Sequence, residues 1–285
     1  MSLAEYAARE GLHRVGGRPP LGRYLRDVWR RRRFIYSLAR FRIEAENGQN
    51  RLGMGWVVLK PILNAAVYGT IFGILLGARN RPDQFVLFLV IGVFFFEYFS
   101  SCFTSGAKSI TKNTHLVQSL SFPRMSLPLA LVTQRLLQFV PMLVIMIALV
   151  LAFGNAPRWD WLLLIPLLGL FSVFNVGLTL ITARLTVHFR DLTQLLPFVA
   201  RFFFYTSGTF FSVEKRFGHN DTIMAIADVQ PIHEFMDLAR SVMLTGPDYV
   251  VDSRYWLFTA AWAFSVLVIG TIYFWAAEER YGRTD

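Results

Sequence analysis

The most informative stretch of this sequence is FVLFLVIGVFFFEYFSSCF, which runs from Phe85 to Phe103 and carries one charged side chain, Glu97. A helix needs about 20 mostly apolar residues to cross the hydrocarbon core of a bilayer, and this stretch has that length and composition. Backbone amides in hydrocarbon must bond within their own segment, and the residues lack the alternating pattern of a barrel strand. The stretch therefore predicts a membrane-spanning helix.

The rest of the chain repeats this pattern. Of its 285 residues, 54% are hydrophobic and only 17% are charged, and the mean hydropathy is +0.42, which is too apolar for the surface of a soluble globule of this size. We therefore predict an all-α membrane protein with six transmembrane helices. The six expected spans are Trp56–Gly77, Phe85–Phe103, Leu127–Phe153, Trp161–Thr182, Leu195–Val213 and Tyr255–Ala277.

The distribution of charge orients these spans. Segment 1–55 is rich in arginine, and the loop 104–126 carries three basic residues and no acidic one, so both are expected in the cytoplasm. The loop 214–254 has more acids than bases and is expected outside, where its apolar part, broken at Gln230-Pro231, fits a re-entrant segment of two short helices. The first 20 residues contain no apolar region typical of a secretory signal. Both termini are thus expected in the cytoplasm, with a membrane domain at 56–277 and a tail at 278–285.

An amphipathic element precedes the first span. Between Leu21 and Ile43, apolar residues recur at helical spacing around a run of arginines, which predicts one or two helices lying at the cytoplasmic interface. Their role is either anchoring or the gathering of an anionic, lipid-linked substrate. The arginines of this element that are expected to meet phosphate groups are Arg30, Arg31, Arg32, Arg33, Arg40 and Arg42.

The ionisable residues within the apolar blocks include Glu97, Arg135 and Arg201. Such side chains are costly in lipid, so each is a functional candidate. Arg135 can extend to the cytoplasmic surface. Glu97 can pair with Arg201, either as a structural link within a subunit or between subunits, or as part of the lining of a translocation path. Most aromatic rings are expected to face lipid or other helices. Those that we consider for the path are Phe94, Phe95, Phe202, Phe203 and Tyr205.

Several chemistries are missing from the sequence. It has no phosphate-binding G-x-x-x-x-G-K-[ST] loop, no H-E-x-x-H pair and no recognisable nucleophile motif, and its five histidines are scattered. The single cysteine, Cys102, lies inside a span. We therefore expect no catalytic residue, no metal site and no cofactor in this chain. The excess of positive charge lies beside membrane segments, which argues against a nucleic acid partner.

Three ordered stretches carry a family resemblance. RLGMGWVVLKPILNAAVYGTIFGILLG (Arg51–Gly77), NTHLVQSLSFPRMSLPL (Asn113–Leu129) and HFRDLTQLLPF (His188–Phe198) resemble segments of ABC-2-type permeases. The likeness is strongest to the polysaccharide-exporting branch, which includes O-antigen, teichoic acid and galactan exporters. One departure is Ser207-Gly208, which stands where the family often has Ser-Pro after the fifth span. That departure leaves the geometry of the outer re-entrant segment open.

The resemblance implies a transport subunit of cell envelope biogenesis in the bacterial plasma membrane. It implies two permease copies with two separate ABC ATPase subunits, which hold ATP and Mg, and export of a polyprenyl-pyrophosphate-linked polysaccharide from the cytoplasm. The helix between spans two and three would dock on the ATPase through Asn113, Thr114, His115, Leu116, Gln118 and Arg124. The resemblance also implies that Arg190 and Asp191 lie near the entrance for the substrate. Two alternatives are a lipid or drug exporter and a membrane-embedded glycan transferase. The transferase would need paired acids, but Asp191 is the only acid between spans on the cytoplasmic side, and it can instead cap the next helix.

Overall fold

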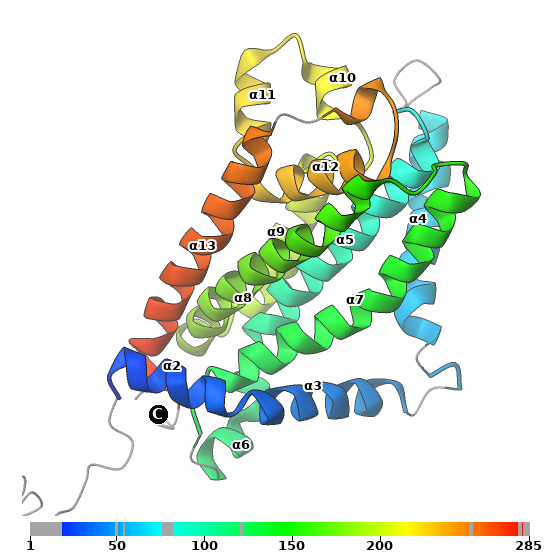
Figure 1. The fold of residues 1–285 in the computed structure, drawn as a ribbon. Helices are drawn as coiled ribbons and strands as arrows, with labels where there is room; N and C mark the ends of the chain where they lie inside the picture. The colour runs from blue at the N-terminus through cyan, green and yellow to red at the C-terminus, as the bar shows by residue number, and fades with distance from the viewer. Residues whose placement is uncertain are drawn as a thin grey trace, which may run out of the picture.

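The computed structural model describes residues 19–48, 51–53, 55–75, 82–119, 122–250, 253–278 and 281. Within these ranges every regular element is a helix and there is no strand (Figure 1). The all-α prediction is therefore confirmed for the described part of the chain. Most of the predicted tail 278–285 and the first part of segment 1–55 lie outside the described residues.

Six long helices form the body of the molecule: α4 (Gly55–Leu75), α5 (Phe85–Ala107), α7 (Ser126–Ala152), α8 (Leu164–His188), α9 (Leu192–Thr206) and α13 (Arg254–Trp275). Four stretches of the described residues are long and apolar enough to cross a membrane: Phe85–Ala107, Ser126–Ala152, Trp159–His188 and Pro247–Trp275. They coincide with four of the six predicted spans, and the other two are not confirmed. Helix α9 has 15 residues, which is short of the length that a bilayer requires.

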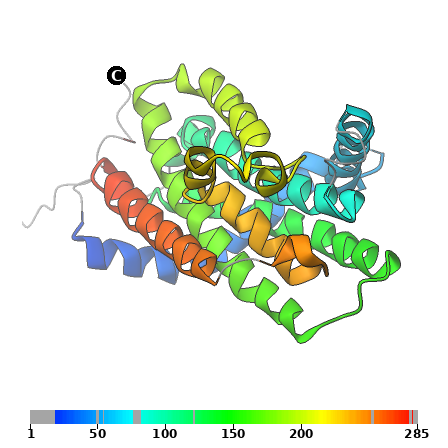
Figure 2. The ribbon, with the colours of Figure 1, turned by 90° about the horizontal axis from the view of Figure 1, so that it is seen from above.

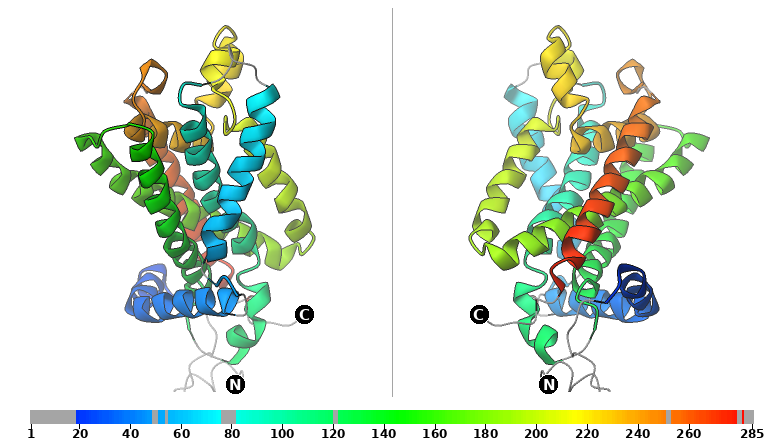
Figure 3. Two further views of the ribbon diagram at one scale, coloured as in Figure 1. Left: turned by 90° about the vertical axis from the view of Figure 1, so that its right-hand side faces the viewer. Right: turned by 90° about the vertical axis from the view of Figure 1, so that its left-hand side faces the viewer.

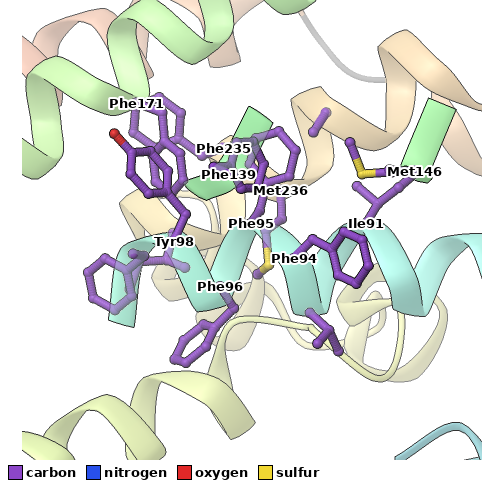
Figure 4. Packing of buried hydrophobic residues seen from close by; sticks show 14 of the residues in the cluster. Ile91, Phe94, Phe95, Phe96, Tyr98, Phe139, Met146, Phe171, Phe235 and Met236 are labelled. Carbon is purple, nitrogen blue, oxygen red and sulfur yellow. The ribbon is translucent and has the colours of Figure 1, made fainter. Parts of the chain in front are cut away.

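Helix α5 lies at the centre, where it packs against α4, α7, α8 and α9. Its aromatic side chains build the core (Figure 4), in which the Phe95 ring stacks on Phe171 at a centroid distance of 5.6 Å and meets the edge of Phe139 at 5.4 Å. Phe94 and Phe95 are fully buried. In this structure these two rings pack the fold and do not line a groove.

At one end of the bundle, α2 (Leu21–Arg30) and α3 (Arg32–Asn47) lie across the long helices (Figures 1 and 3). The buried residues Tyr24, Val28, Ile35, Ala39 and Ile43 follow helical spacing and face the bundle. The predicted amphipathic element is therefore confirmed as two helices. The short helix predicted after the second span is also present, as η2 (Thr111–Asn113) and α6 (Thr114–Ser119), and in Figure 3 it extends past α2 and α3.

The opposite end carries α10 (Val213–Phe217), α11 (Asp221–Ala227), α12 (Pro231–Met243) and the short turn η4 (Pro247–Tyr249). Figure 2 looks down on this end and shows α12 lying over the ends of the long helices, where it packs against α5, α8 and α13. The predicted break at Gln230-Pro231 is confirmed as the start of α12, with Pro231 in its first turn. Re-entry of this segment into a membrane is not confirmed.

Candidate functional site

A polar groove runs between α4, α5 and α9. It encloses about 410 Å³, and we call it the α4–α9 groove. Its wall from α5 is polar, with Glu97 and the hydroxyls of Ser100, Thr104 and Ser105. Its lining also includes Lys108 and Lys112 just after α5, Arg201 of α9, and the rings of Tyr68, Phe96 and Phe204. The groove thus combines hydroxyls, aromatic rings and cations along one path.

The electrostatics of the α4–α9 groove favour an anion. Three cations, Lys108, Lys112 and Arg201, line it against one acid, Glu97. Within the part of the chain that the structure describes, none of these cations forms a salt bridge. Cations that are not neutralised by neighbouring carboxylates leave a positive potential in a cleft, and such a cleft concentrates anionic ligands.

The predicted pair of Glu97 with Arg201 does not form among the described residues. The Glu97 carboxylate instead accepts a hydrogen bond from Ser101 Oγ on its own helix, at 3.3 Å. Glu97 and Arg201 both line the α4–α9 groove, so they face a shared space instead of closing it. The direct link within one chain therefore does not form, a link between two subunits stays a prediction, and the placement of both residues in one polar groove is compatible with a path.

Arg135 lies in a second, smaller pocket of about 140 Å³, which Glu97 also lines. Its guanidinium contacts Glu46 of α3, with Nη2 at 3.3 Å from Oε1, and Nη1 donates to Gln138 Oε1 at 2.8 Å. The Arg135 side chain is 19% exposed. It therefore ties α3 to α7, a pairing that the sequence did not predict, while its extension to the cytoplasmic surface stays a prediction.

The aromatic candidates on α9 divide by exposure. Phe202 is 65% exposed and Tyr205 is 47% exposed. Phe203 is half-buried and meets the edge of Phe99 at a centroid distance of 6.1 Å. Phe202 and Tyr205 are therefore the two predicted path residues that remain at a surface, and their role in a path stays a prediction.

The predicted entrance residues lie at the end that carries α2 and α3. Arg30 is 3.9 Å from Asp27, and Arg40 is 3.3 Å from Glu44, and both pairs are exposed. Such surface pairs contribute little to stability and leave the guanidinium groups accessible. The other arginines predicted here, on α3 or at its start, are Arg31, Arg32, Arg33 and Arg42.

Arg190 and Asp191 are both exposed in the turn between α8 and α9. Asp191 occupies the N-cap position of α9, but its side chain accepts no capping hydrogen bond. The backbone of Asp191 is already helical at that position, with φ of −63° and ψ of −23°, whereas a capping residue has non-helical angles. The predicted cap is therefore not made.

The predicted coupling residues lie in or beside α6. Thr114 and His115 are exposed, Val117 is buried, and Asn113 Nδ2 donates to the Ser109 carbonyl at 2.7 Å. Leu116 is partly buried, and Gln118 belongs to α6 although its side chain is outside the described part. One face of α6 is therefore anchored while Thr114 and His115 point outward.

Arg124 follows α6 and is tied to the end of the chain. Its backbone N–H donates to Glu278 Oε1 at 3.0 Å, while the Tyr24 hydroxyl donates to Glu278 Oε2 at 2.7 Å. Burial raises the pKa of the Glu278 carboxyl, although the hydrogen bonds from Arg124 and Tyr24 oppose this. Because Met125 N–H donates to the Tyr24 hydroxyl at 3.1 Å, these bonds join α2, the start of α7 and the residues after α13.

Sequence reasoning missed Lys108 and Lys112 as site residues. Both were noted only as part of a basic loop, yet they line the α4–α9 groove together with Arg201. Their spacing of i and i+4 after the second span, with no acid nearby in the sequence, was the available signal.

Comparison with known proteins shows which family the chain belongs to. Residues 35–244 match the family model described as ABC-2 type transporter. An O-antigen export system permease protein RfbA of Myxococcus xanthus is 29% identical over 186 residues, which cover 65% of this chain and 70% of that protein. A protein of the same name from Klebsiella pneumoniae is 30% identical over 154 residues, which cover 54% of this chain and 59% of that protein. Because the family model covers most of the chain, from α3 through α12, this protein belongs to the ABC-2 type transporter family.

Proposed function

We propose that this chain is the permease subunit of an ATP-driven exporter that moves a polyprenyl-pyrophosphate-linked polysaccharide from the cytoplasm to the outer face of the bacterial inner membrane. Two copies would form the path, together with two copies of a separate ABC ATPase. Membership of the ABC-2 type transporter family supports the transport role. The names of the relatives, which are O-antigen export permeases, support a polysaccharide substrate.

The observation that carries the proposal is the cationic α4–α9 groove. A diphosphate group presents several anionic oxygens, which ammonium and guanidinium groups bind by charge-assisted hydrogen bonds. Lys108 and Lys112 lie at the end of the groove near α6, and Arg201 lies farther along it on α9. The carrier headgroup would first meet the two lysines, and the hydroxyls along α5 would then contact the sugars that follow.

The ATPase would act on this groove through α6. Helix α6 follows η2, and Lys112 is part of η2 and lines the groove. A partner that pushes on the exposed Thr114 and His115 would therefore move a wall of the groove directly. The N-terminal and C-terminal ends would lie on the same cytoplasmic side, joined to α7 by the bonds of Glu278.

The test is the double variant Lys108→Gln with Lys112→Gln, expressed in a host from which the native gene has been deleted. A hydrogen bond to a charged group contributes about 1.5–3 kcal/mol, so we expect polysaccharide at the cell surface to fall about tenfold or more. Lipid-linked polysaccharide should accumulate inside the cell, and the ATPase should still copurify with the permease. Normal surface polysaccharide in the double variant would overturn the proposal.

Arg216→Gln is the matched control. It also removes positive charge, but from an exposed residue of α10 at the opposite end of the molecule. We expect normal export from it. If Arg216→Gln reduced export as strongly as the double variant, the effect would follow net charge and the groove would not be the substrate site.

A further inference from the structure

Three potential metal ligands converge beside α12, at the end of the molecule opposite α6. They are Glu214 of α10 and His233 and Asp237 of α12, and their ligand atoms lie within 4.8 Å of one another. His233 Nε2 is 3.2 Å from Asp237 Oδ2 and 3.7 Å from Glu214 Oε1. His233 is only 1% exposed, and its Nε2 has no hydrogen-bond partner. A buried imidazole nitrogen is thus aimed at two carboxylates without a bond to either.

Each of the three ligand residues also has a polar contact with a second group, through an atom other than the one that faces the other ligands. His233 Nδ1 is 3.3 Å from the carbonyl oxygen of Ser207, which fixes the ring with Nε2 toward the carboxylates. Glu214 Oε2 accepts from Ser212 Oγ at 2.7 Å, and Asp237 Oδ1 accepts from Arg240 Nη1 at 2.8 Å. Partners of this kind orient the ligands of metal sites and fix the tautomer of a ligating histidine.

Arg240 is part of this support and is itself held by contacts with the backbone and with an aromatic ring. Its Nη2 donates to the carbonyl of Gly208 at 3.0 Å, and its guanidinium carbon lies 3.5 Å from the centre of the Phe88 ring. Arg240 therefore stays on the Oδ1 side of Asp237 and leaves Oδ2 directed at His233.

The spacing of the ligand atoms fits zinc. Tetrahedral Zn²⁺ with bonds of about 2.1 Å places neighbouring ligand atoms about 3.4 Å apart, and the two distances from His233 Nε2, 3.2 and 3.7 Å, lie on either side of that value. An imidazole with two carboxylates favours zinc over the harder Mg²⁺ and Ca²⁺, which prefer oxygen ligands alone. A cavity of about 130 Å³, lined by Glu214, Asp237 and Arg240, lies beside the two carboxylates and has room for water as a fourth ligand.

We propose that Glu214, His233 and Asp237 form a zinc site that links α10 to α12. The ion would stabilise the cap of short helices over the long helices. This inference does not depend on the exported substrate. It differs from the expectation of the sequence, which favoured no metal site because the five histidines are scattered and no tight set of ligands was recognised.

The alternative to a metal ion is a proton on His233. Burial lowers the pKa of His233, but the negative charges of Asp237 and Glu214 outweigh this effect and raise the pKa to about 9. A protonated His233 would then bridge both carboxylates with no ion present. The experiment must therefore detect the ion itself.

The purified permease, with its ATPase partner and a tag that contains no histidine, is stripped with EDTA and titrated with Co²⁺ and then Zn²⁺. We expect the intense visible absorption of tetrahedral Co²⁺, saturation at one ion per permease chain, and displacement by Zn²⁺. This measurement uses the wild-type protein, so misfolding of a variant cannot obscure it. Absence of a stoichiometric ion would overturn the proposal in favour of the protonated histidine.

Variants then locate the ion. Asp237→Asn and Glu214→Gln should each abolish the Co²⁺ absorption, whereas His219→Gln and Asp221→Asn should retain it, because both of those residues are exposed and belong to the same outer segment. Equal loss in His219→Gln or Asp221→Asn would assign the ion to the surface and would also overturn the proposal. Gel filtration of each variant with the ATPase shows that the complex is still assembled.

Discussion

Two glycines set the closest approach of α8 and α13, and alanine at either position should destabilise the protein. A Cβ atom at Gly177 would lie 2.4 Å from the carbonyl carbon of Val266, and a Cβ atom at Gly270 would lie 2.3 Å from the carbonyl oxygen of Gly177. Both neighbours are backbone atoms of a packed helix, so no side-chain rotation can relieve the clash. The helices must move apart along their contact.

The expected magnitude follows from two opposing effects. Overpacking a tight contact costs about 1–3 kcal/mol and occasionally more, and a clash with backbone belongs at the upper end of that range. Alanine in place of glycine favours a helix by up to about 1 kcal/mol. We therefore expect Gly177→Ala and Gly270→Ala to be destabilising by about 2 kcal/mol, which lowers the melting temperature by about 4–8 °C at about 2–4 °C per kcal/mol.

The same helix offers a matched control. Gly169 also lies in α8, but a Cβ atom there would meet nothing within 4 Å. Gly169→Ala should therefore leave the melting temperature unchanged or raise it slightly. The assay is thermal unfolding in detergent, followed by the loss of the monodisperse peak in fluorescence-detected gel filtration. Equal melting temperatures for Gly177→Ala and Gly169→Ala would refute the argument, because they differ in the clash alone.

Three further outcomes are expected. Tyr24→Phe leaves the buried carboxylate of Glu278 without one of its donors, so stability in the same assay should fall by about 1–3 kcal/mol; an unchanged melting temperature would contradict the role of this bond. Glu46→Gln, which weakens the tie from α3 to α7, should destabilise by about 1 kcal/mol, whereas Glu44→Gln breaks an exposed pair and should change little. Thr114→Cys should crosslink through a short bismaleimide to a cysteine introduced at the permease-facing surface of the ATPase, with little background because the native cysteine is buried; absence of a crosslink to any of a set of such cysteines in an assembled complex would count against α6 as the docking element.

The positions of helices were largely predictable from the sequence, but their ends were not. Hydropathy measures the length of an apolar run, and the run from Leu195 continues through Phe211. Helix α9 nevertheless ends at Thr206, and the chain turns at Gly208, whose φ of +69° lies in the left-handed region. Glycine adopts that conformation without the steric cost that a side chain would add. Composition therefore predicted a full membrane span, whereas the helix ends after 15 residues.

The partner of a buried charged residue was harder to predict than the position of that residue within a span. The sequence placed Arg135 within a span, but only the fold shows that the end of α3 brings Glu46 to it. His233 and Glu214 were likewise known to share one outer segment, yet their convergence depends on how α10 folds back over α12. Such contacts join residues on different elements, and no local pattern specifies the angle at which two helices meet.

The aromatic residues of α5 show why composition misdirected part of the site prediction. A ring that faces lipid, a ring in a packed core and a ring along a path have the same hydropathy, and Phe94 and Phe95 proved to be core.

The polar residues of the same helix carried the better signal. Glu97, Ser100, Thr104 and Lys108 recur at intervals of three or four, which places them on one face of a helix. All four line the α4–α9 groove. In a helix this apolar, each polar side chain costs free energy to bury, so a polar stripe is informative where an aromatic run is not. The proposal that α5 forms a wall of the path is therefore better supported by these four residues than by its phenylalanines.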